Sequence, residues 1–144
     1  MSDCIFCKII DGEIPSSKVY EDDHVLAFLD ISQVTKGHTL VIPKTHKKDI
    51  HELSPEIAAN LFSVVPKTTN AMNDTFELKG VNLLNNNGEF AGQSVFHFHL
   101  HIIPRHGEQD GFNLLWDTNM DDYTSAELKS IATEIGAQIK QENQ

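Results

Sequence analysis

Apolar residues gather in five short segments of the chain that polar residues, glycine or proline bound, and such segments predict β-strands. The first two, residues 18–20 and 25–29, are separated by a short polar run and predict a hairpin. Residues 38–43 predict a third strand, residues 81–84 a fourth, and residues 97–103 a fifth, which Pro104 closes. The pattern therefore provides the strands of one small sheet.

Three other segments repeat their apolar residues at helical spacing. Residues 5–10 predict a short helix near the start of the chain. Ser54, Pro55 and Glu56 predict the start of a long helix, because serine caps a helix, proline suits its first turn and an acid favours its positive end. Thr124 and Glu127 have the spacing of a capping box, which predicts a last, C-terminal helix.

The order of these elements indicates the fold class. The strands come in consecutive groups, with one long helix between the third and the fourth. This order is typical of the α+β class: a five-stranded antiparallel sheet with helices packed on one side. With 144 residues and neither repeats nor linkers, we expect a single domain over residues 1–144.

Composition and charge narrow the possible partners. No apolar run approaches the roughly 20 residues that span a bilayer, and the first residues lack the features of a secretory signal. We therefore expect a cytoplasmic protein without a membrane partner. The net charge is −10 and the longest basic cluster is the pair Lys47 and Lys48, so a nucleic acid is not an expected partner. Arg105 is the only arginine, so phosphate chemistry cannot rest on an arginine clamp.

The segment with the most chemical information contains His97, His99 and His101, which alternate with apolar residues. On a strand the three imidazoles would share one face, with neighbours about 6.6 Å apart. A neutral imidazole is a nucleophile at physiological pH, and its cation is an acid in the same range. A zinc site using a His-x-His pair is the alternative, although the outer two would stand about 13 Å apart. The spacing favours a nucleophile and leaves both interpretations open.

Polar residues upstream of the three histidines suit a phosphate. Gln93 and Ser94 can donate hydrogen bonds to oxygens that gain charge during a reaction. Residues 85–92 are rich in amides and glycines, which allow a backbone to approach a phosphate closely. At the other end of the chain, Cys4 and Cys7 have the spacing C-x-x-C. This spacing fits half of a zinc site or two small buried residues, and the cysteines alone do not decide between them.

The sequence resembles a known family. Residues 97–103 match the His-φ-His-φ-His-φ-φ signature of the histidine triad (HIT) superfamily, in which φ is apolar. Further matches to its nucleotide-binding (Hint) branch occur in the family's order, at residues 4–10, 21–23, 26–31, 38–44 and 92–95. They cover roughly residues 4–105. Residues 106–144 resemble the C-terminal extension of bacterial members.

The resemblance implies a nucleotide-binding hydrolase that cleaves purine nucleoside phosphoramidates or adenylated conjugates. His99 is implied as the nucleophile that attacks the α-phosphorus and forms a nucleotidyl-histidine intermediate, which water then hydrolyses. His101 is implied to contact the phosphate and assist proton transfer. The other implied members of the reaction site, which flank the phosphate or support the triad, are Gln93, Ser94, Asn86, His97 and His38.

The resemblance also implies a nucleotide pocket and a metal site. Asp30 would bind the ribose hydroxyls, and a carboxylate accepts two such donors readily. The apolar walls of the base pocket would be Ile5, Phe6, Ile9, Phe28, Ile31 and Leu40. A structural zinc ion would be held by Cys4, Cys7, His46 and His97. This role would withdraw His97 from acid–base chemistry, and no Mg²⁺ is implied. Family members are homodimers, so we expect a homodimer here.

Two alternative functions stay open at this point. The same residues could hydrolyse dinucleoside polyphosphates, which differ in the leaving group. The chain could also be a regulatory module that binds a nucleotide or zinc with negligible turnover. Neither the leaving group nor the purine preference follows from the sequence, and the pattern assigns no role to residues 112–123.

Overall fold

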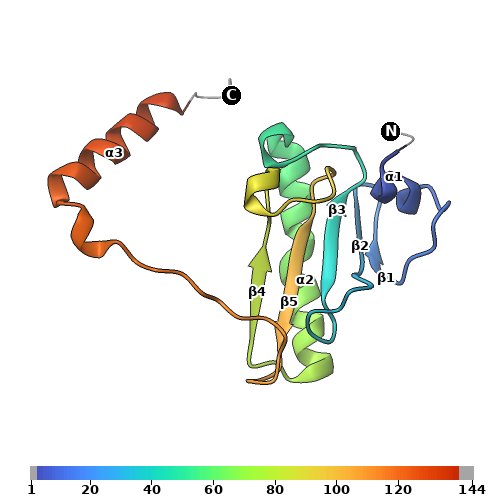
Figure 1. Cartoon of the computed structure of the whole chain (residues 1–144). Coiled ribbons are helices and arrows are strands. Elements are labelled where there is room, and N and C mark those ends of the chain that lie inside the picture. Colours follow the sequence, from blue (N-terminus) through green and yellow to red (C-terminus); the bar gives the residue numbers. More distant parts are fainter. Residues whose placement is uncertain (1–2, 140–144) are drawn as a thin grey trace. The chain divides into compact units, whose positions relative to one another are not determined.

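The computed structural model describes residues 3–139. Its centre is one antiparallel sheet of five strands in the order β1-β2-β3-β5-β4 (Figure 1). The strands are β1 (Lys18–Glu21), β2 (Val25–Leu29), β3 (Thr39–Pro43), β4 (Gly80–Leu84) and β5 (Leu100–Arg105). The predicted α+β class, with its five-stranded antiparallel sheet, is confirmed.

One face of the sheet is covered by the long helix α2 (Pro55–Phe76) (Figure 1). The hydroxyl of Ser54 caps this helix by accepting a hydrogen bond from the amide of Ile57 at 3.1 Å. The helix continues through Pro66 without a break. The core on this face is formed by the buried apolar residues Val25, Ala27, Val41, Leu61, Val64, Val65, Met72, Phe98, Leu100 and Ile102.

The opposite face is covered by the short helix α1 (Ile5–Ile10). Side chains alternate across a strand, so the neighbours of the residues that meet α2 point the other way. They form a second core with α1, made of Phe6, Ile9, Leu26, Phe28, Leu40 and Ile42. The expectation that all helices pack on one side is therefore wrong for α1, because β2 and β3 bury apolar residues on both faces.

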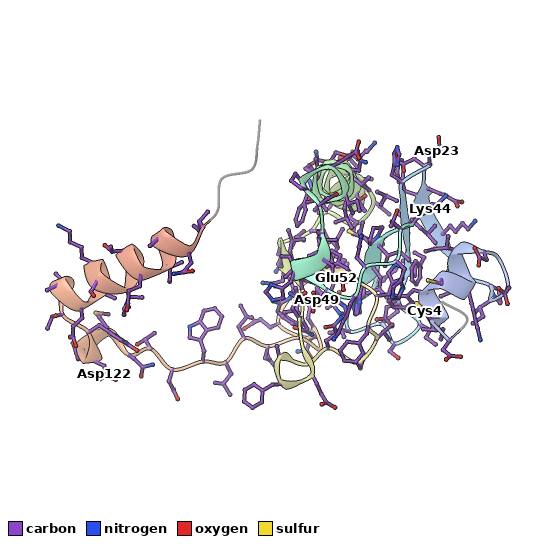
Figure 2. All side chains as sticks on the ribbon, turned by 90° about the horizontal axis from the view of Figure 1, so that it is seen from above. Cys4, Asp23, Lys44, Asp49, Glu52 and Asp122 are labelled. Carbon is purple, nitrogen blue, oxygen red and sulfur yellow. The ribbon has the colours of Figure 1, made fainter. Side chains whose placement is uncertain are left out.

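Polar contacts fix the β1–β2 hairpin and its neighbour. Asp22 accepts hydrogen bonds from the backbone amides of His24 and Val25, each at 2.8 Å. Lys44, labelled in Figure 2, follows β3 and forms an ion pair of 2.8 Å with Glu21 at the end of β1. These contacts hold the turn that the polar run predicted.

The fifth strand begins later than the sequence predicts. Its pairing with β3 starts at Leu100, which lies opposite Val41. Before that point, the amide of Phe98 donates to the carbonyl of Lys47 at 2.6 Å, outside the ladder between β3 and β5. His97 therefore lies in a bend, His99 lies in the irregular segment between this bend and the strand, and only His101 of the three lies within β5. The prediction of a continuous strand from residue 97 is wrong. The predicted alternation is confirmed: Phe98, Leu100 and Ile102 enter the core beneath α2. The imidazoles lie on the other side, where Phe6 of α1 packs against the rings of His97 and His99, and His101 lies beside His99.

Internal contacts divide the chain into two units, Met1–Phe112 and Asn113–Gln144. The second unit contains α3 (Ser125–Gln138). Its predicted capping box is confirmed: Thr124 and Glu127 exchange hydrogen bonds of 2.8 and 3.1 Å. No residue of α3 is buried. A single domain over 1–144, with an extension over 106–144, stays a prediction, and residues 140–144 lie outside the described residues.

Helices in the described part of the chain are either too short or too polar to cross a membrane.

Candidate active site and metal centre

The ring of His99 is held by the backbone of the segment just before β5. Its Nδ1–H donates to the carbonyl of His97 at 2.8 Å, so the lone pair of this neutral ring lies on Nε2. The backbone carbonyl of His99 in turn accepts from the side-chain amide of Asn85 at 2.9 Å. Burial lowers the pKa of His99 below its ordinary value of 6.5. A neutral imidazole with a free Nε2 can attack an electrophile at neutral pH.

A chain of hydrogen bonds sets the protonation of His101. The amide of Val34 donates to Nδ1 of His38 at 3.3 Å, which places the proton of a neutral His38 on Nε2. That proton is donated to Nδ1 of His101 at 2.9 Å. The remaining ring proton of His101 therefore lies on Nε2. Burial, and then the neighbouring rings of His99 and His38, lower the pKa of His101 to about 4, so this ring is a neutral hydrogen-bond donor.

Both rings border a cavity of about 400 Å³. All six apolar residues predicted for the base pocket line it: Ile5, Phe6, Ile9, Phe28, Ile31 and Leu40. Ile31 is 99% exposed and forms the rim. Residues that the sequence did not single out also line it: Ile14, Pro15, Ser16, Leu29, Gly92 and Val95. The cavity thus combines apolar walls with two imidazoles, as is typical of a small-molecule site.

Three predicted polar residues, Asp30, Asn86 and Ser94, line the same cavity. One oxygen of Asp30 accepts from the amide of Ser32 at 2.7 Å. The other oxygen lies 3.8 Å from Nε2 of His38. The carboxylate is thus fixed near the imidazoles, and its acceptor capacity exceeds these contacts. It can accept hydrogen bonds from a hydroxylated ligand.

Gln93 has a different position from the one expected. Its side chain is buried and does not line the cavity. The amide oxygen accepts from the backbone of Gly88 at 2.8 Å. The amide nitrogen donates to the carbonyls of Lys48 and Val95 at 2.8 and 3.1 Å. With these bonds Gln93 ties three loop segments together, a role that the sequence pattern does not reveal.

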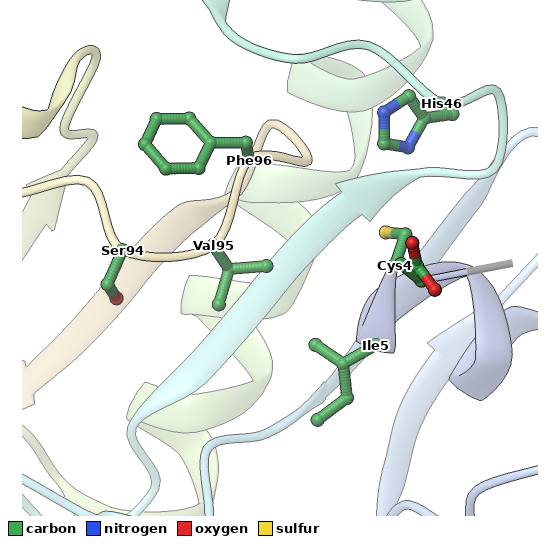
Figure 3. A pocket seen from close by; sticks show the side chains of 7 residues that line it. Cys4, Ile5, His46, Ser94, Val95 and Phe96 are labelled. Atoms are coloured by element: carbon green, nitrogen blue, oxygen red, sulfur yellow. The ribbon is translucent and has the colours of Figure 1, made fainter. Parts of the chain in front are cut away.

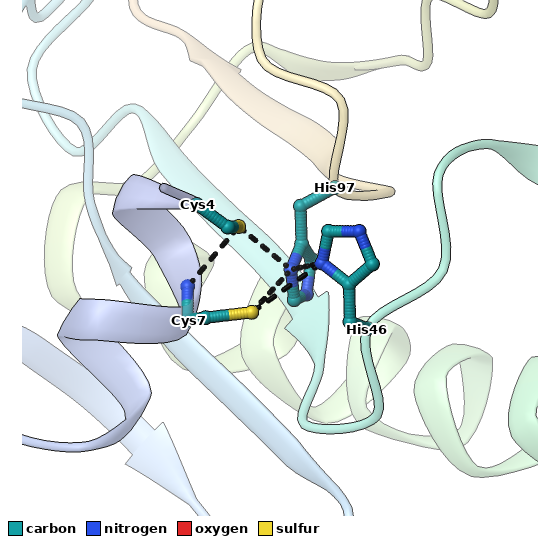
Figure 4. Close-up of side chains that lie close together, drawn as sticks. All are labelled: Cys4, Cys7, His46 and His97. Carbon is teal, nitrogen blue, oxygen red and sulfur yellow. Dashed lines mark hydrogen bonds between the residues drawn. The ribbon is translucent and has the colours of Figure 1, made fainter. Parts of the chain in front are cut away.

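His97 turns away from this cavity toward Cys4, the N-cap of α1, and Cys7 within α1. The potential ligand atoms of Cys4, Cys7, His46 and His97 all lie within 4.8 Å of one another (Figure 4). The two Nδ1 atoms are 3.2 Å apart, Cys4 Sγ is 3.4 Å from Nδ1 of His97, and Cys7 Sγ is 3.3 Å from Nδ1 of His46. Two sulfur and two nitrogen atoms in one cluster form a donor set that can hold a metal ion.

The protonation of this cluster also fits a cation. Nε2–H of His97 donates to the carbonyl of Pro43 at 2.8 Å, so the lone pair on Nδ1 points into the cluster. Such an outer hydrogen bond is typical of histidine ligands. Burial, followed by the neighbouring Cys4 thiol, raises the pKa of Cys7 to about 11. A cation would offset this rise by stabilising the thiolate.

The three triad histidines do not converge on one point. His97 belongs to the cysteine cluster, whereas His101 contacts His38. Asp30, His38 and His101 also lie within 4.8 Å of one another, but Nε2 of His38 carries a proton and offers no lone pair there. The geometry therefore does not favour the alternative of a metal site on the triad.

Comparison with known proteins identifies the family. The HIT domain matches residues 11–108, and the chain belongs to the HIT family. It is 61% identical over 136 residues to "Protein hit" of Bacillus subtilis, with 94% of each chain covered. It is 43% identical to the adenosine 5'-monophosphoramidase hnt1 of Schizosaccharomyces pombe, with 95% of this chain and 98% of the relative covered.

Solved structures agree with this assignment. A crystal structure of a HIT family protein from Bacillus anthracis has a TM-score of 0.94 and 65% identity, covering 96% of this chain and 98% of that one. A Zn-bound histidine triad family protein from Mycobacterium smegmatis has a TM-score of 0.72 and 34% identity, covering 96% and 99%.

Proposed function

We propose that the protein hydrolyses purine nucleoside phosphoramidates or related adenylated conjugates, with Nε2 of His99 as the nucleophile. The observation that carries this proposal is the hydrogen bond from His99 Nδ1–H to the carbonyl of His97, at 2.8 Å. It leaves a free lone pair on a buried, neutral ring beside a cavity of nucleotide-like dimensions. The monophosphoramidase name of the fission-yeast relative supports the same reaction class.

The first step exchanges one bond to phosphorus for another. His99 Nε2 attacks the α-phosphorus, and the bond to the leaving nitrogen breaks. That nitrogen keeps the electron pair and takes a proton from the hydroxyl of Ser94, which regains one from water. Nε2–H of His101 donates to a phosphoryl oxygen as its charge grows. The product of this step is a nucleotidyl-His99 intermediate.

Water completes the reaction. It attacks the same phosphorus and gives its proton to the hydroxide left when Ser94 was reprotonated. The electron pair of the P–N bond returns to Nε2 of His99, and a nucleoside monophosphate leaves. Burial keeps the pKa of His99 low, so the released imidazole returns to its neutral form. Asp30 would accept hydrogen bonds from the ribose hydroxyls, Asn86 would lie on the phosphate side, and the apolar walls of the cavity would enclose the purine.

We also propose that Cys4, Cys7, His46 and His97 bind one structural zinc ion. Zinc with two thiolates and two imidazoles forms a closed tetrahedral site that supplies folding free energy and no chemistry. The ligands come from α1, from the segment after β3 and from the bend before β5, so the ion would join these three segments. The Zn-bound relative from Mycobacterium smegmatis supports this assignment.

We propose that the protein forms a homodimer through β4. In the sheet of residues 3–112, β4 is an edge strand, and Leu83 and Leu84 on it are exposed apolar residues. An unprotected edge strand favours pairing with another strand. Sedimentation of the wild type and of Leu83→Lys tests this, with a dimer expected only for the wild type. A cytoplasmic location stays a prediction.

Hydrolysis of adenosine 5'-phosphoramidate by the wild type and by His99→Ala tests the reaction. We expect turnover by the wild type and at least a 1,000-fold loss in the variant, about 4 kcal/mol, with adenosine monophosphate still bound by both. Binding without turnover by the wild type would favour the regulatory module instead. Faster cleavage of a dinucleoside polyphosphate would favour the other leaving-group class.

A further inference from the structure

A second cavity lies beside the nucleotide cavity and shares part of its wall. It has a volume of about 640 Å³. Ile5, Ser94 and Val95 line both cavities. Figure 3 shows Ile5 on α1, and Ser94 and Val95 on the loop before β5. The imidazoles of His99 and His101 line only the first cavity. Ser94 therefore belongs to the wall that the nucleotide cavity and the second cavity share.

The walls of this second cavity are mostly apolar. Phe96, which Figure 3 shows on the same loop as Ser94, is 41% exposed, and Ile5 is 46% exposed. Asp3 contributes a carboxylate, and the remaining wall comes from Cys4 and His46 of the metal cluster. Among the described residues that line the cavity, none is a lysine or an arginine.

We propose that this second cavity receives the leaving group, and that it selects primary amines with an apolar, preferably aromatic, body. This inference rests on the proposed function. In a displacement at phosphorus, the attacking and leaving atoms stand roughly in line, so the leaving group points away from His99. With Ser94 at the leaving nitrogen, the rest of the amine continues past Val95 onto the ring of Phe96.

The charges of the cavity disfavour an anionic leaving group. A polyphosphate carries several negative charges and needs several cationic or N–H donors, whereas the ionisable lining residue outside the metal cluster is the carboxylate of Asp3. The nearest cation at Phe96 is Lys48, whose ammonium lies 5.8 Å from the ring centroid. One lysine does not match a polyphosphate chain. The cavity therefore discriminates between the two leaving-group classes that the sequence left open.

A comparison of two substrates tests this proposal. Both carry adenosine on the phosphorus; one releases ammonia and the other releases 2-phenylethylamine. We expect Phe96→Ala to lower kcat/KM for the phenylethylamine conjugate about 10-fold, the size of one lost aromatic contact. The same variant should leave kcat/KM for the ammonia conjugate unchanged, because ammonia does not reach Phe96.

The matched control is Phe62→Ala on α2, since Phe62 is 44% exposed and lines neither cavity. This variant should leave kcat/KM unchanged for both substrates. Phe96→Leu keeps an apolar wall if the alanine variant folds poorly, and it should show a smaller loss on the aromatic conjugate only. Equal losses on both substrates, or no loss on either, would overturn the leaving-group site while leaving the hydrolase intact. Absence of turnover by the wild type would overturn the proposed function itself.

Discussion

Nδ1 of His99 and the backbone carbonyl oxygen of His97 lie 2.8 Å apart. The side chain of His97 belongs to the cysteine–histidine cluster, whereas its carbonyl orients the proposed nucleophile. Phe6 lies on α1, which contains Cys7 and is capped by Cys4. Its ring packs edge-on against both imidazoles, with centroid distances of 5.9 and 5.1 Å. The metal cluster and the proposed nucleophile are therefore connected in two ways: through His97, which contacts both, and through the ring of Phe6.

This coupling predicts the effect of removing the metal ligands. Replacing Cys4 and Cys7 by serine should abolish binding of one zinc per chain and lower the melting temperature, because metal binding contributes to folding. It should also lower kcat, because the bend that carries the His97 carbonyl loses its anchor. Metal analysis, thermal melting and phosphoramidate turnover measure the three effects. Unchanged metal content and melting would leave the cysteines as ordinary core residues.

The hydrogen bond from His38 to His101 predicts a role for His38 in catalysis without substrate contact. In His38→Leu, Nδ1 of His101 loses its donor and the ring can adopt the other tautomer. We expect kcat/KM to fall roughly 10- to 100-fold, with adenosine monophosphate affinity nearly unchanged. His38→Gln retains an N–H donor and should recover part of the loss. Full activity of the leucine variant would show that His38 does not contribute to catalysis through His101.

The pH profile depends on the direction of the His99 pKa shift. Attack requires the neutral ring, and burial lowers the pKa of His99 below 6.5. As the pH falls, the decline of kcat/KM should therefore be centred below pH 6.5. The charge of Asp30 raises the pKa of His99, so Asp30→Asn should move this decline to still lower pH. Rates measured between about pH 4 and pH 8 test both statements, and a decline centred above 6.5 contradicts them.

A pair of glycines offers a stability test. Gly12 and Gly37 both have positive φ, +82° and +95°, so alanine at either position should cost about 1 kcal/mol of backbone strain. A Cβ at Gly12 meets nothing within 4 Å, whereas one at Gly37 would lie 3.0 Å from Phe76 and 3.2 Å from Pro104. Gly37→Ala should therefore destabilise more, by a further ~1 kcal/mol or more. Chemical denaturation measures both, and equal losses would contradict the predicted clash.

The local elements could be predicted from the sequence because each depends on nearby residues. Ser54 and the pair Thr124 and Glu127 cap their helices as their spacing indicates. The apolar segments also give the strands to within a few residues, apart from the start of β5. That start depends on a hydrogen bond between Phe98 and Lys47, which are far apart in the sequence, so periodicity alone could not locate it.

Residues of the candidate site that belong to a family motif could be predicted from the sequence. Their hydrogen-bond partners and ring tautomers could not, because these depend on contacts that only the folded chain makes. The residues expected to line the nucleotide pocket do line one cavity. Gln93 belongs to the family motif at residues 92–95, yet its side-chain amide forms hydrogen bonds with the backbone of Gly88, Lys48 and Val95. The tautomers of His38 and His101 depend on the amide of Val34, a backbone group that no residue pattern reveals.

The most direct test of the account is the mass of the intact protein during turnover of adenosine 5'-phosphoramidate. Rapid acid-free quenching preserves a phosphorus–nitrogen bond to histidine long enough for mass spectrometry. We expect a transient increase equal to one adenylyl group in the wild type, located on His99 by fragmentation, and no increase in His99→Ala. Turnover without any adduct, or an adduct that persists in His99→Ala, would contradict the proposed nucleotidyl-His99 intermediate.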